Sequence, residues 1–104
     1  MNVRTEEKGD TAIIYLSGDF DISNSSLVRD ELKKLLDTGK RIIIDLSGIR
    51  YVDSTGVATL VWGFRASQDK KIEFALRGVR GPVEDVLKIT RLDSIFPRAE
   101  EPIS

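Results

Sequence analysis

The chain has 104 residues, of which 40% are hydrophobic and 32% charged, a size and composition typical of one compact domain. Its 16 Lys and Arg residues against 17 Asp and Glu residues give a net charge of -1, which leaves no positive surplus for holding a nucleic-acid backbone. The absence of cysteine and histidine excludes disulfides, thiol nucleophiles, thiolate or imidazole metal sites, and catalytic triads with a histidine base.

The first third of the chain predicts a strand followed by a helix. Residues 11–16 are rich in β-branched and aromatic side chains and indicate a buried strand, which Ser17 and Gly18 close. Residues 2–7 allow a further strand at the edge of the same sheet. After the polar segment 19–26, apolar residues recur at helical spacing and predict an amphipathic helix that starts near Asn24. These apolar residues are Leu27, Val28, Leu32, Leu35 and Leu36.

Three features mark the ends of this first helix. The side chains of Ser23, Asn24 and Ser25 can each accept a hydrogen bond from the free N–H groups of a helix start. Gly39 follows the last apolar residue and is placed to end the helix. We therefore expect a helix that starts near Asn24 and ends before Gly39.

The middle of the chain predicts the central strand and a second helix. Residues 41–46 form an apolar run without alternation, which is typical of a strand covered on both faces in a parallel sheet. After a turn at Ser47 and Gly48, a helix is expected to start near Ser54 and to end at Lys70 and Lys71. Its apolar positions are Val57, Leu60, Val61 and Phe64.

The last third predicts one more strand and one more helix. Residues 72–76 read as a strand, and Gly81 with Pro82 opens a short helix that turns Val83, Val86 and Leu87 inward. We expect residues 98–104 to be a loose tail. The alternation of strands and helices predicts an α/β fold for residues 1–104 as a single domain, with a mixed, partly parallel β-sheet packed with amphipathic helices.

The most informative segment is 42–60, in which a buried strand leads through a short loop into a helix that begins with Asp53, Ser54, Thr55 and Gly56. This segment resembles the STAS domains, and among them the bacterial anti-sigma-factor antagonists, whose Asp-Ser-Ser/Thr-Gly motif holds a serine that a partner kinase phosphorylates. The sequence LSGDFD at residues 16–21 and the spacing over residues 83–96 extend the resemblance over most of the chain.

The resemblance implies a regulator that binds proteins and needs no catalytic residue or cofactor of its own. Its unphosphorylated form would bind an anti-sigma factor with serine kinase activity and free a sigma factor. Phosphorylation of Ser54 would end this binding, and a serine phosphatase would restore it. Thr55 is the alternative acceptor.

The position of Ser54 fits this role on physical grounds. A hydroxyl at the start of a helix is accessible from an exposed loop, and the free N–H groups of the helix can accommodate a phosphate. The phosphate would add about -1.5 to -2 charges beside Asp53, and beside Asp21 if the first strand ends nearby, so the fold should survive while a docking surface is lost. The simpler interpretation is that Ser54 only caps the helix, for which Asp53 is an equally good cap.

We expect the partner surface to comprise the two loops at the strand ends and the start of the second helix. Its predicted residues are Asp21, Ser23, Asn24, Tyr51, Asp53, Ser54, Thr55 and Gly56. The simpler interpretation of Asp19 and Asp21 is that they are solvated turn residues. Trp62 falls off the main apolar stripe and is either an exposed binding anchor or a partly buried aromatic.

Two other functions fit parts of the sequence. A STAS subunit could dock on a transporter or a lipid-trafficking complex without any phosphate. A phosphoaspartate receiver would instead use Asp45 as acceptor, with Asp19 and Asp21 as magnesium ligands. No apolar run approaches the roughly 18 residues that span a bilayer, so we expect a cytoplasmic protein without direct membrane insertion.

Overall fold

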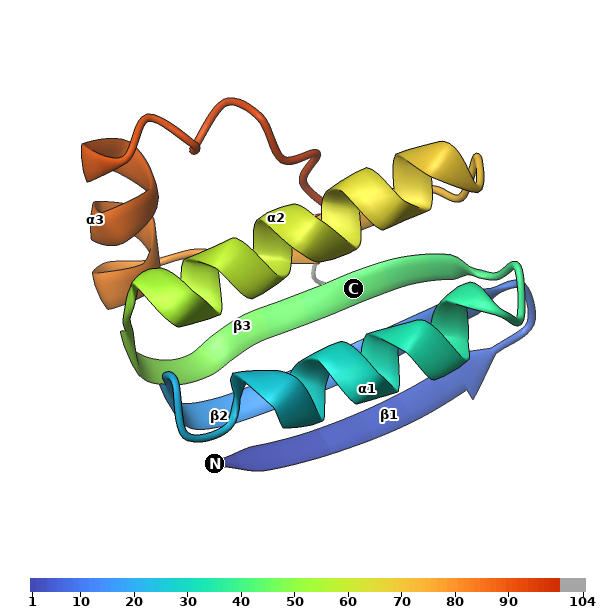
Figure 1. Cartoon of the computed structure of the whole chain (residues 1–104), viewed down its shortest axis with the longest axis horizontal. Helices are drawn as coiled ribbons and strands as arrows, with labels where there is room; N and C mark the ends of the chain where they lie inside the picture. Colours follow the sequence, from blue (N-terminus) through green and yellow to red (C-terminus); the bar gives the residue numbers. More distant parts are fainter. Residues whose placement is uncertain (100–104) are drawn as a thin grey trace, which may run out of the picture.

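The computed structural model describes residues 1–99 and arranges them as four strands and three helices (Figure 1). In chain order the elements are β1 (Asn2–Lys8), β2 (Thr11–Phe20), α1 (Ser25–Leu36), β3 (Arg41–Val52), α2 (Ser54–Asp69), β4 (Phe74–Arg77) and α3 (Gly81–Ile89). The predicted α/β class and the order of the elements are confirmed.

The strands form one mixed sheet in the order β1-β2-β3-β4. β1 is the predicted edge strand and pairs antiparallel to β2. β2, β3 and β4 are parallel, with Ile14 opposite Ile44 and Ile44 opposite Leu76. The β-branched run of β3 therefore lies inside the sheet, where both of its edges are paired.

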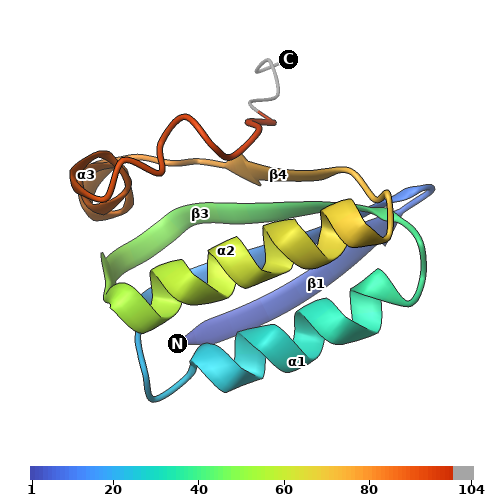
Figure 2. The same ribbon diagram turned by 45° about the horizontal axis from the view of Figure 1, so that its top comes forward.

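Helices α1 and α2 lie side by side over one face of the sheet, and α3 lies apart from them at one end of the molecule, where Figure 2 shows it nearly end-on. The core between helices and sheet holds the predicted apolar stripes, including Leu32 and Leu60, which are fully buried. Leu27 is the exception, because its side chain is 54% exposed. One residue along an α-helix is about 100° around its axis, and this turns Leu27 away from the stripe of its neighbour Val28.

Strands β2 and β3 are both longer than predicted. Ser47 and Gly48, expected to form a turn, lie inside β3, and β2 continues through Ser17 and Gly18 to Phe20. The pairing of the two strands shifts register twice, so the polar and small residues are absorbed in bulges rather than in a turn. Gly48 permits this because a Cβ at that position would lie 2.8 Å from the Cβ of Ser17.

The longer strands bring two distant loops together. β2 ends at Phe20 and β3 ends at the paired residue Val52, so the loop after each strand starts at the same edge of the sheet. The backbone N–H of Asp53 donates to the carbonyl of Phe20 at 3.2 Å and joins the two ends.

The opposite face of the sheet carries a smaller cluster of Ile13, Ile43, Ala75 and Ala99. Ala99 donates its N–H to the carbonyl of Leu76 at 2.9 Å, so this residue, expected in a loose tail, is held against β4. The rest of that expected tail, residues 100–104, lies outside the described residues. Within residues 1–99, no helix combines the length and the apolar character needed to cross a membrane.

Candidate functional site

Ser54 is the first residue of α2 and follows the end of β3 by one residue. Its side chain is exposed, and within residues 1–99 its hydroxyl has no hydrogen-bond partner. The first N–H groups of a helix have no partner within the helix, and Ser54 is part of this first turn. An exposed hydroxyl and free backbone donors therefore meet at one point of the surface.

Asp53, not Ser54, caps α2. The Oδ1 atom of Asp53 accepts a hydrogen bond from the backbone N–H of Gly56 at 2.9 Å. Of the two caps that the sequence allowed, Ser54 is therefore not the one used, and Asp53 is. The cap belongs to the neighbouring carboxylate, because Asp53 has the extended backbone that points its side chain back over the first turn.

The second carboxylate oxygen of Asp53 reaches the loop after β2. Its Oδ2 atom accepts a hydrogen bond from the backbone N–H of Ile22 at 3.1 Å. One side chain thus fixes both the start of α2 and the loop that precedes α1. This loop and Ser54 form a common surface.

Internal hydrogen bonds order the loop over residues 21–24. The carboxylate of Asp21 accepts from the backbone N–H and the hydroxyl of Ser23. The Oδ1 atom of Asn24 accepts from the N–H of Asp21 at 3.0 Å, and its Nδ2 atom donates to the carbonyl of Asp19 at 2.6 Å. Asn24 is the N-terminal boundary residue of α1. Its side chain, predicted to be able to cap the helix, does not do so, because it closes the loop instead.

The predicted partner-surface residues lie around Ser54 with different accessibilities. Ser23, Tyr51 and Ser54 are exposed, and Asp21, Asn24, Asp53 and Thr55 are half-buried. Gly56 is buried, since a Cβ there would lie 2.7 Å from the carbonyl oxygen of Phe20. Its part in the site is to let α2 start close against the end of β2.

The surface also has an apolar component, of which the sequence analysis predicted Tyr51 but missed Ile22. Ile22 is 76% exposed, and Tyr51, at the end of β3, is 52% exposed. Tyr51 precedes Asp53 by two residues, and Ile22 donates its backbone N–H to the Asp53 carboxylate. An isoleucine within the polar segment 19–26 was the available signal. Large apolar side chains held in solvent beside polar groups are typical of binding surfaces.

Asp45 occupies a different environment on the face of the sheet away from α1 and α2. Its Oδ2 atom is 2.9 Å from Arg77 Nε, and its Oδ1 atom accepts from the backbone N–H of Ser47 at 2.9 Å and from the Ser47 hydroxyl. Burial acts to raise the pKa of the Asp45 carboxyl, but the hydrogen bonds from Ser47 and Arg77 outweigh it and hold the pKa below its ordinary value.

This geometry does not form the receiver site considered above. Asp45 pairs with Tyr15, whereas Asp19 lies four residues further along β2, which places the two carboxylates about 13 Å apart along the strands. Asp45 is already occupied by Arg77 and Ser47, and no group of acidic residues within 1–99 is arranged to hold a metal ion.

Comparison with known proteins agrees with this fold. The STAS domain family matches residues 2–103. The anti-sigma F factor antagonist of Paenibacillus polymyxa is 24% identical over 99 residues, which cover 93% of this chain and 85% of that protein. The anti-sigma-B factor antagonist of Listeria monocytogenes is 28% identical over 100 residues, covering 92% and 88%.

Solved structures share the same architecture. The unphosphorylated form of the anti-sigma factor antagonist SpoIIAA is 16% identical, with a TM-score of 0.75 over 99% of this chain and 90% of that one. The phosphorylated form of the Bacillus cell fate determinant SpoIIAA is 17% identical, with a TM-score of 0.76 over 96% and 91%. At these identities the likeness establishes the fold.

Proposed function

The chain belongs to the STAS domain family, and from this premise we propose that it is an anti-sigma factor antagonist switched by phosphorylation of Ser54. In its unphosphorylated form it binds an anti-sigma factor with serine kinase activity and so frees a sigma factor in the cytoplasm. The kinase transfers the terminal phosphoryl group of ATP to Ser54 Oγ and releases ADP. A serine phosphatase hydrolyses the phosphate and restores binding.

The observation that carries this proposal is that Asp53 caps α2 and leaves the Ser54 hydroxyl exposed. Because Asp53 caps α2, the Ser54 hydroxyl is exposed and unbonded among the described residues, and it can be modified without loss of a structural hydrogen bond. Thr55 is half-buried and is the less accessible of the two hydroxyls. Two relatives, named an anti-sigma F factor antagonist and an anti-sigma-B factor antagonist, support the choice of partner.

Electrostatics explain why phosphate would end binding and leave the fold intact. The N–H groups at the start of α2 can bind the phosphate, so the helix is not destabilised. Asp21 and Asp53 are only half-buried, and about -1.5 to -2 further charges would be added next to Asp53. A partner that fits the unmodified site would then have to desolvate a cluster of like charges.

Phosphate mapping tests the acceptor. The protein is incubated with ATP and a candidate anti-sigma kinase, and the modified residue is located by mass spectrometry in the native chain and in Ser54→Ala and Thr55→Ala. Loss of phosphate only in Ser54→Ala is expected. Undiminished phosphate in that variant would assign Thr55 instead, and an acid-labile signal would indicate an acyl phosphate on a carboxyl group.

Binding by calorimetry tests the switch. We expect the unmodified protein to bind the anti-sigma factor at least about tenfold more tightly than the Ser54 phosphoprotein, a difference of about 1.4 kcal/mol. Equal affinities of the two forms would overturn the switch and favour a STAS subunit that docks on a transporter or lipid-trafficking complex.

A further inference from the structure

We propose that the groove between α1 and α2 is the docking site for an acidic amphipathic helix of the protein partner. The inference rests on the proposed function, which supplies a protein partner at Ser54, and adds the chemistry that the partner presents. The α1–α2 groove is defined by two adjoining hollows of about 230 and 310 Å³ that share Ala58, the smaller lined by both helices and the larger by α2 alone. The first is lined by Ser25, Ser26, Arg29, Thr55, Ala58 and Thr59, and the second by Ala58, Val61, Trp62, Arg65, Ala66 and Asp69.

The groove has the shape of a helix-binding surface. It runs along α2 from Thr55 to Asp69, and at 1.5 Å per residue this is about 21 Å, or about four turns of a second helix. Small residues such as Ala58 and Ala66 form its floor, so the backbone of a partner helix can approach closely. Peptide helices bind such grooves by placing one apolar face into them.

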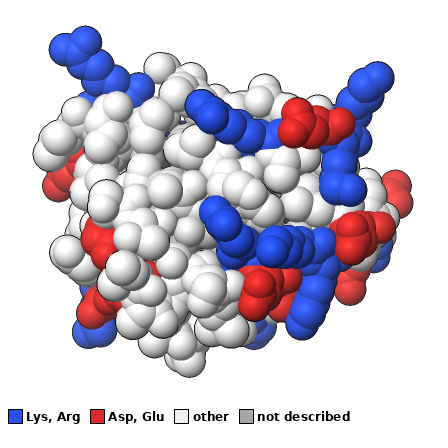
Figure 3. Space-filling view, viewed as in Figure 1, with Lys and Arg blue, Asp and Glu red and all other residues white. Residues whose placement is uncertain are grey.

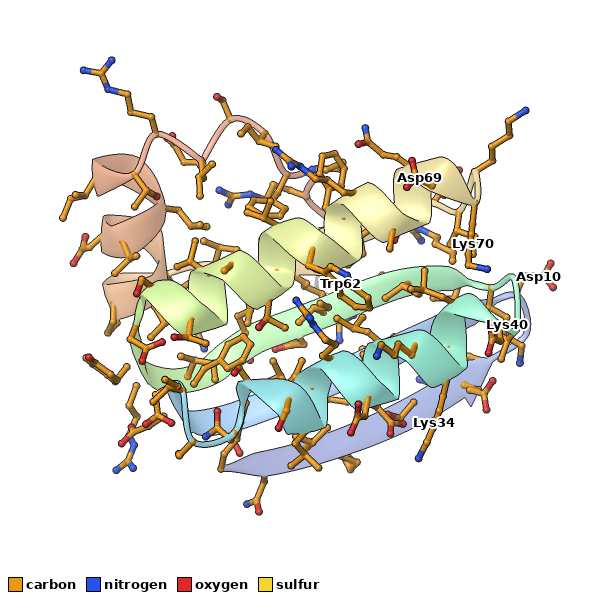
Figure 4. The ribbon with its side chains drawn as sticks, viewed as in Figure 1. Asp10, Lys34, Lys40, Trp62, Asp69 and Lys70 are labelled. Atoms are coloured by element: carbon orange, nitrogen blue, oxygen red, sulfur yellow. The ribbon has the colours of Figure 1, made fainter. Side chains whose placement is uncertain are left out.

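Trp62 supplies an apolar anchor in the middle of the groove. It projects from α2 toward α1, where the Arg29 guanidinium lies 4.6 Å from the centre of its ring (Figure 4). The ring is partly buried and packs against the core, which answers the open question about its position. Partly buried tryptophans with an accessible edge are frequent centres of binding energy at protein interfaces.

The sign of the partner's charge follows from the groove's cations. Arg29 and Arg65 are exposed, and neither forms an ion pair with another residue of the described chain. Lys33 follows Arg29 by one turn of α1 on the same row. Figure 3 shows Lys and Arg side chains gathered from the centre of this face toward its right side, with Asp and Glu side chains next to them. Cations without an ion-pair partner beside an apolar trough are complementary to carboxylates that flank an apolar stripe, and the one acidic residue of the lining, Asp69, lies at the far end from Ser54.

An acidic helix also accounts for the effect of phosphate. The groove begins at Thr55, the residue after Ser54, so a phosphate on Ser54 would lie at its mouth. There it would repel the carboxylates of the docked helix and compete with them for the basic groove. A basic partner would instead be attracted by the phosphate, contrary to the proposed switch.

The single tryptophan of the chain makes a direct test possible, because Trp62 reports on occupancy of the groove. The probe is a synthetic amphipathic peptide of about 16 residues with a leucine stripe flanked by glutamates. The control peptide carries lysine in place of every glutamate. We expect a saturable change in Trp62 emission with the glutamate peptide, weakened by added salt, and no change with the lysine peptide.

Matched charge reversals locate the binding. Arg29→Glu should weaken the glutamate peptide at least about tenfold. Lys34→Glu makes the same change of charge on the other flank of α1, where Lys34 contacts Glu31 beside β1, and should leave the affinity within about twofold. Arg65→Glu serves as a second variant if Arg29→Glu does not fold. Equal effects of Arg29→Glu and Lys34→Glu, or equal binding of both peptides, would overturn the inference.

Two further arms separate this inference from the proposed function and from a membrane role. If phosphorylation of Ser54 weakens binding of the partner but Arg29→Glu and Arg65→Glu do not, the groove inference fails while the switch stands. If the peptide binds but no Ser54-sensitive partner exists, the switch fails while the groove stands. A Trp62 response to phosphatidylglycerol vesicles without a response to the glutamate peptide would assign the groove to an anionic lipid surface and overturn the inference.

Discussion

The Asp53 carboxylate accepts a hydrogen bond from the backbone N–H of Ile22, a residue 31 positions earlier in the chain, while it caps α2 through Gly56. The start of α2 and the loop before α1 are therefore held by one side chain. A change of charge at Ser54 acts on the neighbouring Asp53 carboxylate, and through it on both segments at once.

Replacing Asp53 should show both contacts. Asp53→Ala removes two hydrogen bonds to a charged acceptor and should lower the free energy of unfolding by about 2 kcal/mol in urea titrations. Asp53→Asn retains one acceptor oxygen, so it should lose about half as much. Hydrogen exchange of the Ile22 amide should accelerate in Asp53→Ala. An unchanged exchange rate would show that the contact between Asp53 and Ile22 does not protect the loop.

Ser54→Ala should leave the stability almost unchanged. Its hydroxyl makes no hydrogen bond within residues 1–99, so the free energy of unfolding should change by less than about 0.5 kcal/mol. The variant should bind the anti-sigma factor whether or not kinase and ATP are present. A loss near that of Asp53→Ala would mean that the two residues share the cap.

The exposed side chains of Ile22 and Tyr51 should contribute to partner affinity but not to the stability of the fold. Ile22→Ala and Tyr51→Ala should each weaken partner binding by at least about 1 kcal/mol in calorimetry, with unfolding midpoints close to that of the native chain. Ile95→Ala is the matched control, because Ile95 is 46% exposed and adjoins Phe96, which packs on Phe64 ten residues along α2 from Ser54. Equal losses at Ile95 would indicate a nonspecific effect of apolar surface.

The Asp45–Arg77 pair should make stability depend on acid pH. The pKa of Asp45 is lowered in the folded chain, so its contribution is complete above the ordinary pKa of a carboxyl and is lost as the pH falls through the folded value. Unfolding midpoints measured between pH 7 and pH 2 should fall less steeply in Asp45→Asn, which is already weaker at pH 7. Arg77→Met should cost about 1.5 to 3 kcal/mol at pH 7 because it leaves a charged acceptor without its partner. Parallel pH profiles of Asp45→Asn and the native chain would contradict this assignment.

Residues whose role depends on periodicity were predictable from the sequence. The inward positions of Leu32, Leu60 and Ile44 follow from helical spacing or from an unbroken β-branched run, since burial selects these patterns. Position along the chain likewise placed Ser54 at the start of a helix. The apolar periodicity and the position of Ser54 relative to the helix start are properties of local sequence, and the structure retains them.

Features that depend on pairing between distant segments were not predictable. Gly48 reads locally as a turn residue, and only its close approach to Ser17 explains a bulge within a longer strand. Asn24 is a good helix cap by type, but the loop carbonyl of Asp19 competes for its side chain. The exposure of Ile22 follows from its tether to Asp53, which no local pattern encodes.

The two bulges of β3 also determine which insertions and deletions the site can tolerate. Between the paired positions Tyr15–Asp45 and Phe20–Val52, β3 uses two more residues than β2, and these residues carry its end level with Phe20. Deleting Gly48 would convert one bulge into regular pleat, with Ser47 opposite Ser17, and would leave Ile49 and Val52 on the inner face and Ser54 at the same edge of the sheet. Deleting Ile44 would instead exchange the two faces of the strand up to the first bulge. Length variation in homologous chains should therefore be confined to the bulges, where an added or missing residue leaves both the inner face of the strand and the position of the serine unchanged.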